Sequence, residues 1–196
     1  MVKIFSITDL LLDLAQDVRT GIENCPERYK LAYSVPCWNS FPLGGCKFSA
    51  FMFAGYLNCF FESEILHEHG CRGKESHSWT VVNDYIVDLT VDQFPQEFNS
   101  KIYVGTRNSF YLSFQEDAEK HRFADLIDCN QTLEYDWYYG SSFVALKETL
   151  PFEENFHLIN QNRDILPSIF SIRPYAQAKM LFEIKMKKCN QIRTSF

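Results

Sequence analysis

Apolar residues near the start of the chain recur at the three- and four-residue steps that place side chains on one face of a helix. Thr8 has a side chain that can cap a helix N-terminus. The pattern predicts a first, structural helix from about Thr8 to Gly21. Its buried stripe consists of Leu10, Leu11, Leu14 and Val18.

A second apolar segment begins at Cys46, after a stretch from Cys25 to Gly45 in which Pro and Gly residues are typical of a loop. Its apolar side chains occupy nearly every face of a helix, and this distribution indicates burial on all sides. We therefore expect a largely buried helix that starts at Cys46. Its core residues are Phe48, Phe51, Met52, Tyr56, Leu57 and Phe60.

Two segments rich in Val, Ile, Tyr and Trp follow, the first from His77 to Asn83 and the second from Tyr85 to Thr90. This composition predicts two strands, and the pair Asn83 and Asp84 predicts the turn between them. The polar stretch between Cys59 and Glu75 predicts a loop. Further strands are predicted over 101–105 and 110–114, and a helix after Pro174 over 175–188.

Length and composition suit one folded domain. The 196 residues lie within the size that a single hydrophobic core can organise. Hydrophobic residues make up 46% of the chain and include 18 Phe, which excludes an intrinsically disordered protein. We expect a single α+β domain over residues 1–196, in which N-terminal helices pack on an antiparallel sheet.

Charge and cysteine usage restrict the class of protein. The formal net charge of -6 argues against general nucleic-acid binding, which needs clustered Lys and Arg. No apolar run is long enough for a membrane span, and Asp9 and Asp13 interrupt the apolar N-terminal stretch where a signal peptide would be continuous. The seven cysteines at irregular spacing do not resemble a secreted disulfide framework. These features predict a cytoplasmic protein with mostly reduced, buried cysteines.

Cys46 is a candidate nucleophile because of its place in the sequence. Gly44 and Gly45 give the backbone freedom for a tight entry, and the thiol then stands at the start of a helix. Amide N–H groups and the positive end of the helix dipole stabilise a thiolate at this point. The same amides could hold the oxyanion of a tetrahedral intermediate. Taken alone, however, a cysteine on an apolar helix is usually a packing residue.

The predicted hairpin supplies the partners of a thiol. A two-residue turn at Asn83 and Asp84 places Trp79 opposite Asp88, so His77 and Asp88 become diagonal neighbours on one face. A carboxylate there can fix the tautomer of the imidazole and stabilise its protonated form after it takes the thiol proton. Cys46, His77 and Asp88 are thus the predicted catalytic residues.

This order of residues resembles that of papain-like and transglutaminase-like cysteine enzymes, a superfamily whose arrangement arylamine N-acetyltransferases share. It is most similar to a poorly characterised bacterial group with Phe-Pro-x-Gly-x-Cys, His-x-Trp and Asp-x-Thr-x-x-Gln-Phe segments. The chain has these segments at 41–46, 77–79 and 88–94. The resemblance implies a papain-like or transglutaminase-like catalytic core over about 36–114 and leaves the role of 115–196 open. Lys47 and Phe48 depart from the group, in which small or acidic residues are expected after the cysteine.

Three polar residues near the predicted site have weaker assignments. Gln93 is expected to close the turn before Pro95 rather than to serve the chemistry. A polar side chain upstream of the cysteine supplies an oxyanion donor in papain-like enzymes. By this resemblance Asn39 or Ser40 is a candidate for that role.

Two other classes compete with an enzyme. His67, His69 and Cys71 lie close together in the sequence with Cys59 and His77 nearby, but the spacing lacks the paired ligands of structural zinc sites. A binding module that kept the fold and lost turnover is the second rival. We expect neither a metal nor another cofactor, and the intact set of three residues favours an enzyme over both alternatives.

The expected activity is hydrolysis of an amide or isopeptide bond in a protein or peptide substrate, through a thioester with the enzyme. Glutamine deamidation and transglutaminase-type acyl transfer pass through the same thioester, so they remain alternatives. A small solitary enzyme of this kind is also compatible with a bacterial effector or toxin that is exported from the cytoplasm.

Overall fold

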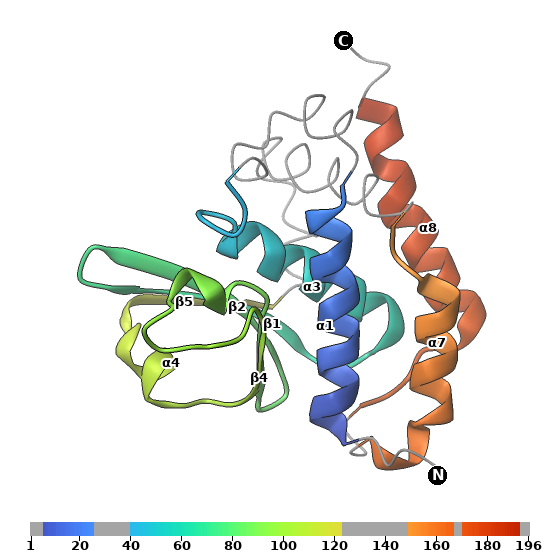
Figure 1. Cartoon of the computed structure of the whole chain (residues 1–196). Helices are drawn as coiled ribbons and strands as arrows, with labels where there is room; N and C mark the ends of the chain where they lie inside the picture. Colours follow the sequence, from blue (N-terminus) through green and yellow to red (C-terminus); the bar gives the residue numbers. More distant parts are fainter. Residues whose placement is uncertain (1–5, 26–39, 123–148, 167–169, 193–196) are drawn as a thin grey trace.

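The computed structural model describes residues 6–25, 40–122, 149–166 and 170–192 (Figure 1). The protein is of the predicted α+β class, with one antiparallel sheet and several helices. The strands are β1 (Ile65–Arg72), β2 (Glu75–Val82), β3 (Tyr85–Asp88), β4 (Tyr103–Thr106) and β5 (Glu116–Arg122). The helices are α1 (Ile7–Glu23), α3 (Cys46–Phe60), α4 (Ser109–Ser113), α7 (Phe152–Gln161) and α8 (Tyr175–Ile192), with short 3-10 helices η2 (Val91–Gln93) and η3 (Arg163–Ile165).

The sheet has the strand order β4-β3-β2-β1-β5, so the predicted hairpin lies at its centre. β2 and β3 are joined by the two-residue turn at Asn83 and Asp84, and Asn83 adopts a positive φ of 54°. The register pairs Val82 with Tyr85 and continues in steps of one residue, as the sequence predicts. The predicted strand over 101–105 is also present, shifted slightly as β4.

The stretch between Cys59 and Glu75 contains a strand, so the prediction of a loop there is wrong. β1 pairs along its whole length with β2 and on its other side with β5. Its polar side chains are compatible with a strand because Glu68 is buried among donors: the indole N–H of Trp79, the guanidinium of Arg107 and, at 3.1 Å, the ammonium of Lys120. Because the residues of this segment are polar, the sequence did not indicate that they form a strand inside the sheet.

The apolar run 110–114 forms helix α4, and the prediction of a strand is wrong there too. Asn108 caps this helix, because its side-chain oxygen accepts hydrogen bonds from the backbone N–H groups of Phe110 at 3.0 Å and Tyr111 at 3.4 Å. The following chain crosses β1 so closely that a Cβ on Gly70 would lie 2.0 Å from the backbone oxygen of Phe114. Only glycine permits this approach.

Helices α1, α3, α7 and α8 pack together beside the sheet, and α3 contacts both β1 and β2 (Figure 1). α3 starts at Cys46 and is buried almost throughout, as predicted. α8 starts after Pro174 as predicted. In α1 the cap is Ser6 rather than Thr8, because the side chain of Ser6 accepts a hydrogen bond from the backbone N–H of Asp9 at 3.2 Å.

The sheet separates two apolar clusters. The larger contains residues of α1, α3, α7 and α8 together with Val82 and Val87. The smaller, here called the aromatic cluster, lies over the other face of the hairpin and consists of Trp79, Val81, Ile86, Phe94, Phe110, Tyr111 and Phe114. Alternation along β2 thus sends neighbouring side chains into different cores. Among the described helices, none has the length and apolar character needed to cross a membrane.

Candidate active site

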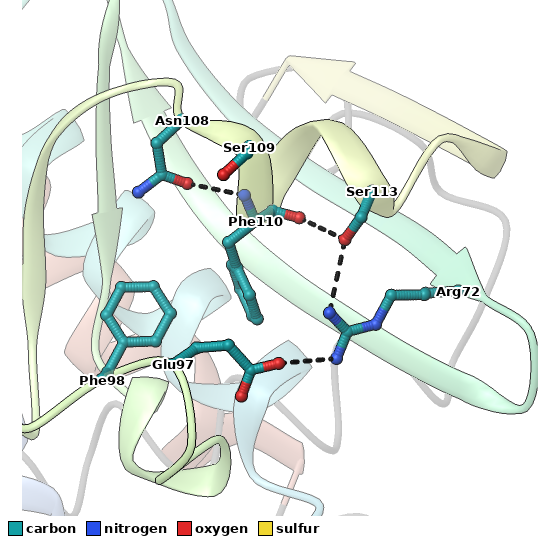
Figure 2. A pocket seen from close by; sticks show the side chains of 7 residues that line it. All are labelled: Arg72, Glu97, Phe98, Asn108, Ser109, Phe110 and Ser113. Atoms are coloured by element: carbon teal, nitrogen blue, oxygen red, sulfur yellow. Dashed lines mark hydrogen bonds and ion pairs between the residues drawn. The ribbon is translucent and has the colours of Figure 1, made fainter.

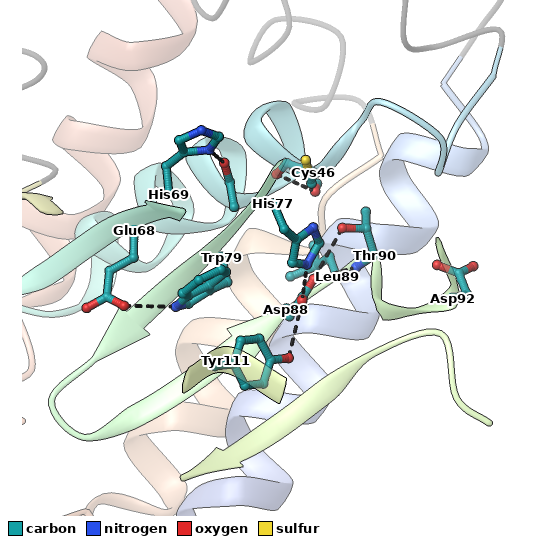
Figure 3. A network of polar contacts seen from close by, with 12 residues as sticks. Cys46, Glu68, His69, His77, Trp79, Asp88, Leu89, Thr90, Asp92 and Tyr111 are labelled. Atoms are coloured by element: carbon teal, nitrogen blue, oxygen red, sulfur yellow. Dashed lines mark hydrogen bonds and ion pairs between the residues drawn. The ribbon is translucent and has the colours of Figure 1, made fainter. Parts of the chain in front are cut away.

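His77 and Asp88 form a direct contact inside the protein (Figure 3). Nε2 of His77 lies 2.5 Å from Oδ2 of Asp88, and both side chains are fully buried. β2 and β3 position the two residues, because the turn at Asn83 and Asp84 sets the register that makes them diagonal neighbours. This is the geometry that the hairpin predicts.

Asp88 accepts hydrogen bonds on both carboxylate oxygens. Oδ1 accepts the backbone N–H of Thr90 at 2.9 Å and its hydroxyl at 3.2 Å. Oδ2 accepts the phenolic hydroxyl of Tyr111 at 3.2 Å in addition to the ring of His77. A buried carboxylate without partners would be strongly destabilising, so these donors are what allow Asp88 to remain charged in the interior.

Cys46 comes to the same place from the other side of the sheet. It is the first residue of α3 and is a free thiol with 9% of its surface exposed. β3 pairs with β2 only from Thr80 onward, so β3 leaves the edge of β2 at His77 uncovered and the start of α3 can reach the ring. Among the described residues, Nδ1 of His77 has no hydrogen-bond partner, so Nδ1 is the ring atom left for the thiol.

The charges of this group favour a protonated imidazole. Burial alone would lower the pKa of His77, but the carboxylate of Asp88 and the thiol of Cys46 together raise the pKa of His77 to about 10. The raised pKa favours the imidazolium form of His77 at neutral pH. A positive ring beside Cys46 and the N-terminus of α3 both stabilise a thiolate.

Aromatic rings enclose His77 on the side away from α3. The ring centroid of Phe94 lies 4.9 Å from that of His77, and those of Trp79, Phe110 and Phe114 lie 5.8 to 6.0 Å away. These rings exclude water and hold the imidazole in one orientation.

Sequence reasoning missed two residues of this group. Thr90 belongs to the Asp-x-Thr segment, but the segment alone did not reveal its two hydrogen bonds to Asp88. Tyr111 was missed because 110–114 was read as a strand. A signal was present in Asn108, whose side chain is typical of a helix cap three residues before Tyr111.

The weaker sequence assignments have mixed outcomes. Ser40 donates its hydroxyl to the backbone oxygen of Leu43 at 3.1 Å, so it closes its own turn. Asn39 lies outside the described residues. Gln93 belongs to η2 and its backbone N–H donates to Thr90, which agrees with a turn-closing role. The nitrogen of its side chain is buried and has no partner among the described residues.

Strand β1 contains His67, His69 and Cys71 at every second position, so these residues do not lie in a loop. In the described part of the chain, no three His, Cys, Asp or Glu side chains are arranged to hold a metal ion. His69 instead contacts the hydroxyl of Ser78 through Nδ1 at 2.8 Å. Burial, together with the nearby charge of Lys47, lowers the pKa of His67 to about 4, so this ring is neutral at neutral pH.

A hollow of about 410 Å³ opens on the outer side of the aromatic cluster (Figure 2). Arg72 stands at its wall, where its guanidinium lies 2.8 Å from Glu75 and 3.3 Å from Glu97. Phe110 lines the hollow and also contacts the ring of His77. The hollow contains none of Cys46, His77 and Asp88, so it is separate from the candidate active site.

Fold and site together define a class of protein: an α+β domain in which a helix-initiating thiol, an imidazole and a buried carboxylate lie together at the edge of a hairpin. Comparison of the chain with protein-family models, with curated proteins and with solved structures finds no match. The chemistry of the site is therefore the basis for assigning a function.

Proposed function

We propose that the protein is a thiol enzyme that hydrolyses an amide or isopeptide bond in a protein or peptide, with Cys46 as nucleophile, His77 as acid and base, and Asp88 as the group that orients His77. The observation that carries the proposal is the buried contact of 2.5 Å between His77 and Asp88, with the thiol of Cys46 beside the same ring. A buried, charged pair of this kind is costly for a purely structural role.

The reaction follows from the resting charges. The thiolate of Cys46 attacks the carbonyl carbon, and the C–N bond breaks as the imidazolium of His77 gives its proton to the leaving amine. A thioester and a neutral imidazole result. Water then attacks the thioester while His77 takes its proton, the C–S bond breaks, and the product acid leaves with the thiolate and imidazolium restored.

We also propose that the fold is a papain-like or transglutaminase-like core. A helix that begins at the nucleophile, packed on an antiparallel sheet that carries the histidine and the aspartate, supports a papain-like or transglutaminase-like core. The backbone N–H of Cys46 lies in the first turn of α3, where it has no acceptor within the helix, and we assign it to the oxyanion. A cytoplasmic location is proposed because the mechanism needs a reduced Cys46.

The test is trapping of the acyl-enzyme. The protein is incubated with a panel of peptide thioesters and peptide amides, and intact mass spectrometry records any covalent adduct. The adduct should form on the wild type, disappear in Cys46→Ala and His77→Ala, and remain in Cys59→Ala. Cys59 is a matched control because it is a second buried cysteine on α3. An adduct that persists in Cys46→Ala would overturn the proposal.

A second measurement separates the three reactions that share a thioester. Adding a primary amine to the assay gives an amide product only if the enzyme transfers acyl groups, whereas release of the free acid alone identifies a hydrolase. Release of ammonia from glutamine side chains with conversion to glutamate, and with no amide formed from the added amine, identifies a deamidase.

A further inference from the structure

Tyr111 reaches the candidate active site from outside the three residues that define it. Its hydroxyl donates to Oδ2 of Asp88 at 3.2 Å, the same oxygen that contacts His77 (Figure 3). The side chain is fully buried, and burial, together with the negative charge of Asp88, raises the pKa of Tyr111. The phenol therefore keeps its proton and acts only as a donor.

The chain fixes this hydroxyl at several points. Asn108 starts α4 by capping it, and the side-chain nitrogen of Gln115 donates to the backbone oxygen of Tyr111 at 3.2 Å. The ring packs against Trp79 at 5.1 Å and Tyr103 at 5.3 Å between centroids. A ring packed against these neighbours cannot swing its hydroxyl to another acceptor without disturbing the aromatic cluster.

We propose that Tyr111 is a positioning residue of the thiol site, whose hydroxyl keeps Asp88 ionised and thereby keeps the proton on His77. The inference rests on the proposed function and deepens it. Asp88 and His77 compete for one proton along their short contact, and each neutral donor to the carboxylate favours the state with the proton on the ring. The imidazolium in turn stabilises the thiolate of Cys46.

Removing the hydroxyl of Tyr111 should raise the pH at which Cys46 becomes reactive. In Tyr111→Phe the buried carboxylate loses one of its donors, so the proton shifts toward Asp88 and His77 carries less charge. The thiolate of Cys46 then needs a higher pH to form. We expect alkylation of Cys46 at neutral pH to slow by about tenfold, and the midpoint of its rate against pH to rise.

The experiment measures modification of Cys46 by iodoacetamide in the full chain from about pH 5 to about pH 9, with peptide mass spectrometry as readout. The matched control is Tyr103→Phe, because Tyr103 lies in the same ring packing but donates its hydroxyl to the backbone oxygen of Thr106 at 2.6 Å. Tyr103→Phe should keep the wild-type midpoint. Thermal unfolding of each variant records any purely structural effect.

The outcomes separate the two proposals. A wild-type Cys46 that alkylates no faster than Cys71 overturns the proposed function and this inference with it. A fast wild-type Cys46 whose midpoint is unchanged in Tyr111→Phe overturns the inference alone, even if that variant unfolds at a lower temperature. If Tyr111→Phe does not fold, 3-fluorotyrosine at position 111 replaces it, because its stronger donor should lower the midpoint. An unchanged midpoint there overturns the inference as well.

Discussion

Asp88 shows how a charge can be maintained in the protein interior. Its side chain is buried, yet Thr90, Tyr111 and His77 supply donors to both oxygens. Three of these four hydrogen bonds come from neutral groups, which stabilise the carboxylate without neutralising it. The charge therefore remains available to His77, and the orientation of the imidazole depends on it.

Asp88→Asn tests this dependence. The amide fills the same space, so we expect the fold to be retained, but it cannot stabilise the imidazolium or impose the tautomer that leaves Nδ1 for the thiol. Acyl-enzyme formation should fall by roughly 10³-fold or more with little change in substrate affinity. Rapid-quench mass spectrometry measures the acylation rate against substrate concentration.

Asp84→Asn is the matched control, because the exposed turn residue lies on the same hairpin and its amide should leave acylation unchanged. If Asp88→Asn acylates at the wild-type rate, Asp88 does not orient His77 and the site reduces to a pair of Cys46 and His77.

At the residue scale the sequence predicted the groups that alternate on one hairpin. His77 and Asp88 are separated by a turn whose length could be read from Asn83 and Asp84, and the register followed. Tyr111 could not be found in this way, because it arrives 23 residues after Asp88 on a helix. Its contact depends on tertiary packing, which local patterns do not encode.

At the scale of elements, Arg19 connects α1 to the segment that follows Asp88. This side chain is buried and donates to the backbone oxygen of Leu89 and, at 2.8 Å, to the carboxylate of Asp92 in η2. Nε of Arg19 also donates to the carboxylate of Glu23 at 2.8 Å. The first helix, predicted as structural, thus holds the turn that positions the candidate active site.

Replacing Arg19 by Ala should cost about 3 to 5 kcal/mol of unfolding free energy, because Asp92 and the oxygen of Leu89 lose a buried partner. Urea denaturation followed by circular dichroism measures the loss. The control is Glu23→Ala, which removes a partly exposed partner of the same guanidinium and should cost less than about 1 kcal/mol. Equal losses in the two variants would contradict the assigned role of Arg19.

The two mistaken elements have different physical causes. β1 was read as a loop because its polar residues are compensated by partners from other elements, as Trp79, Arg107 and Lys120 compensate Glu68. α4 was read as a strand because a short apolar run has no detectable period, and its cap at Asn108 decides the conformation. Long periodic segments such as α1 and α3 were predictable because burial on a fixed face dominates them.

At the scale of the whole molecule, two buried histidines set opposite pH dependences. The pKa of His67 is lowered to about 4, so between about pH 6.5 and pH 4 the unfolded chain binds more protons, and stability falls as the pH decreases. The pKa of His77 is raised to about 10, but in the proposed ion pair Cys46 has given up its proton, whereas the unfolded chain keeps that thiol proton up to about pH 8.5. The folded state therefore binds more protons, and stability falls as the pH increases, from about pH 8.5 to about pH 10. We therefore expect maximal stability between about pH 6.5 and about pH 8.5.

Two variants distinguish the acid limb of this stability profile, where stability falls as the pH decreases, from the alkaline limb, where stability falls as the pH increases. The unfolding free energy is measured by urea titration at intervals from about pH 4 to about pH 10. His67→Leu should flatten the acid limb, which is worth about 2 to 4 kcal/mol because each pKa unit corresponds to about 1.4 kcal/mol. His77→Gln should flatten the alkaline limb instead, since it removes the proton held by Asp88 and Cys46.

The exposed His157, changed to Gln, is the control and should preserve both limbs. An acid limb that survives in His67→Leu would show that His67 does not set it.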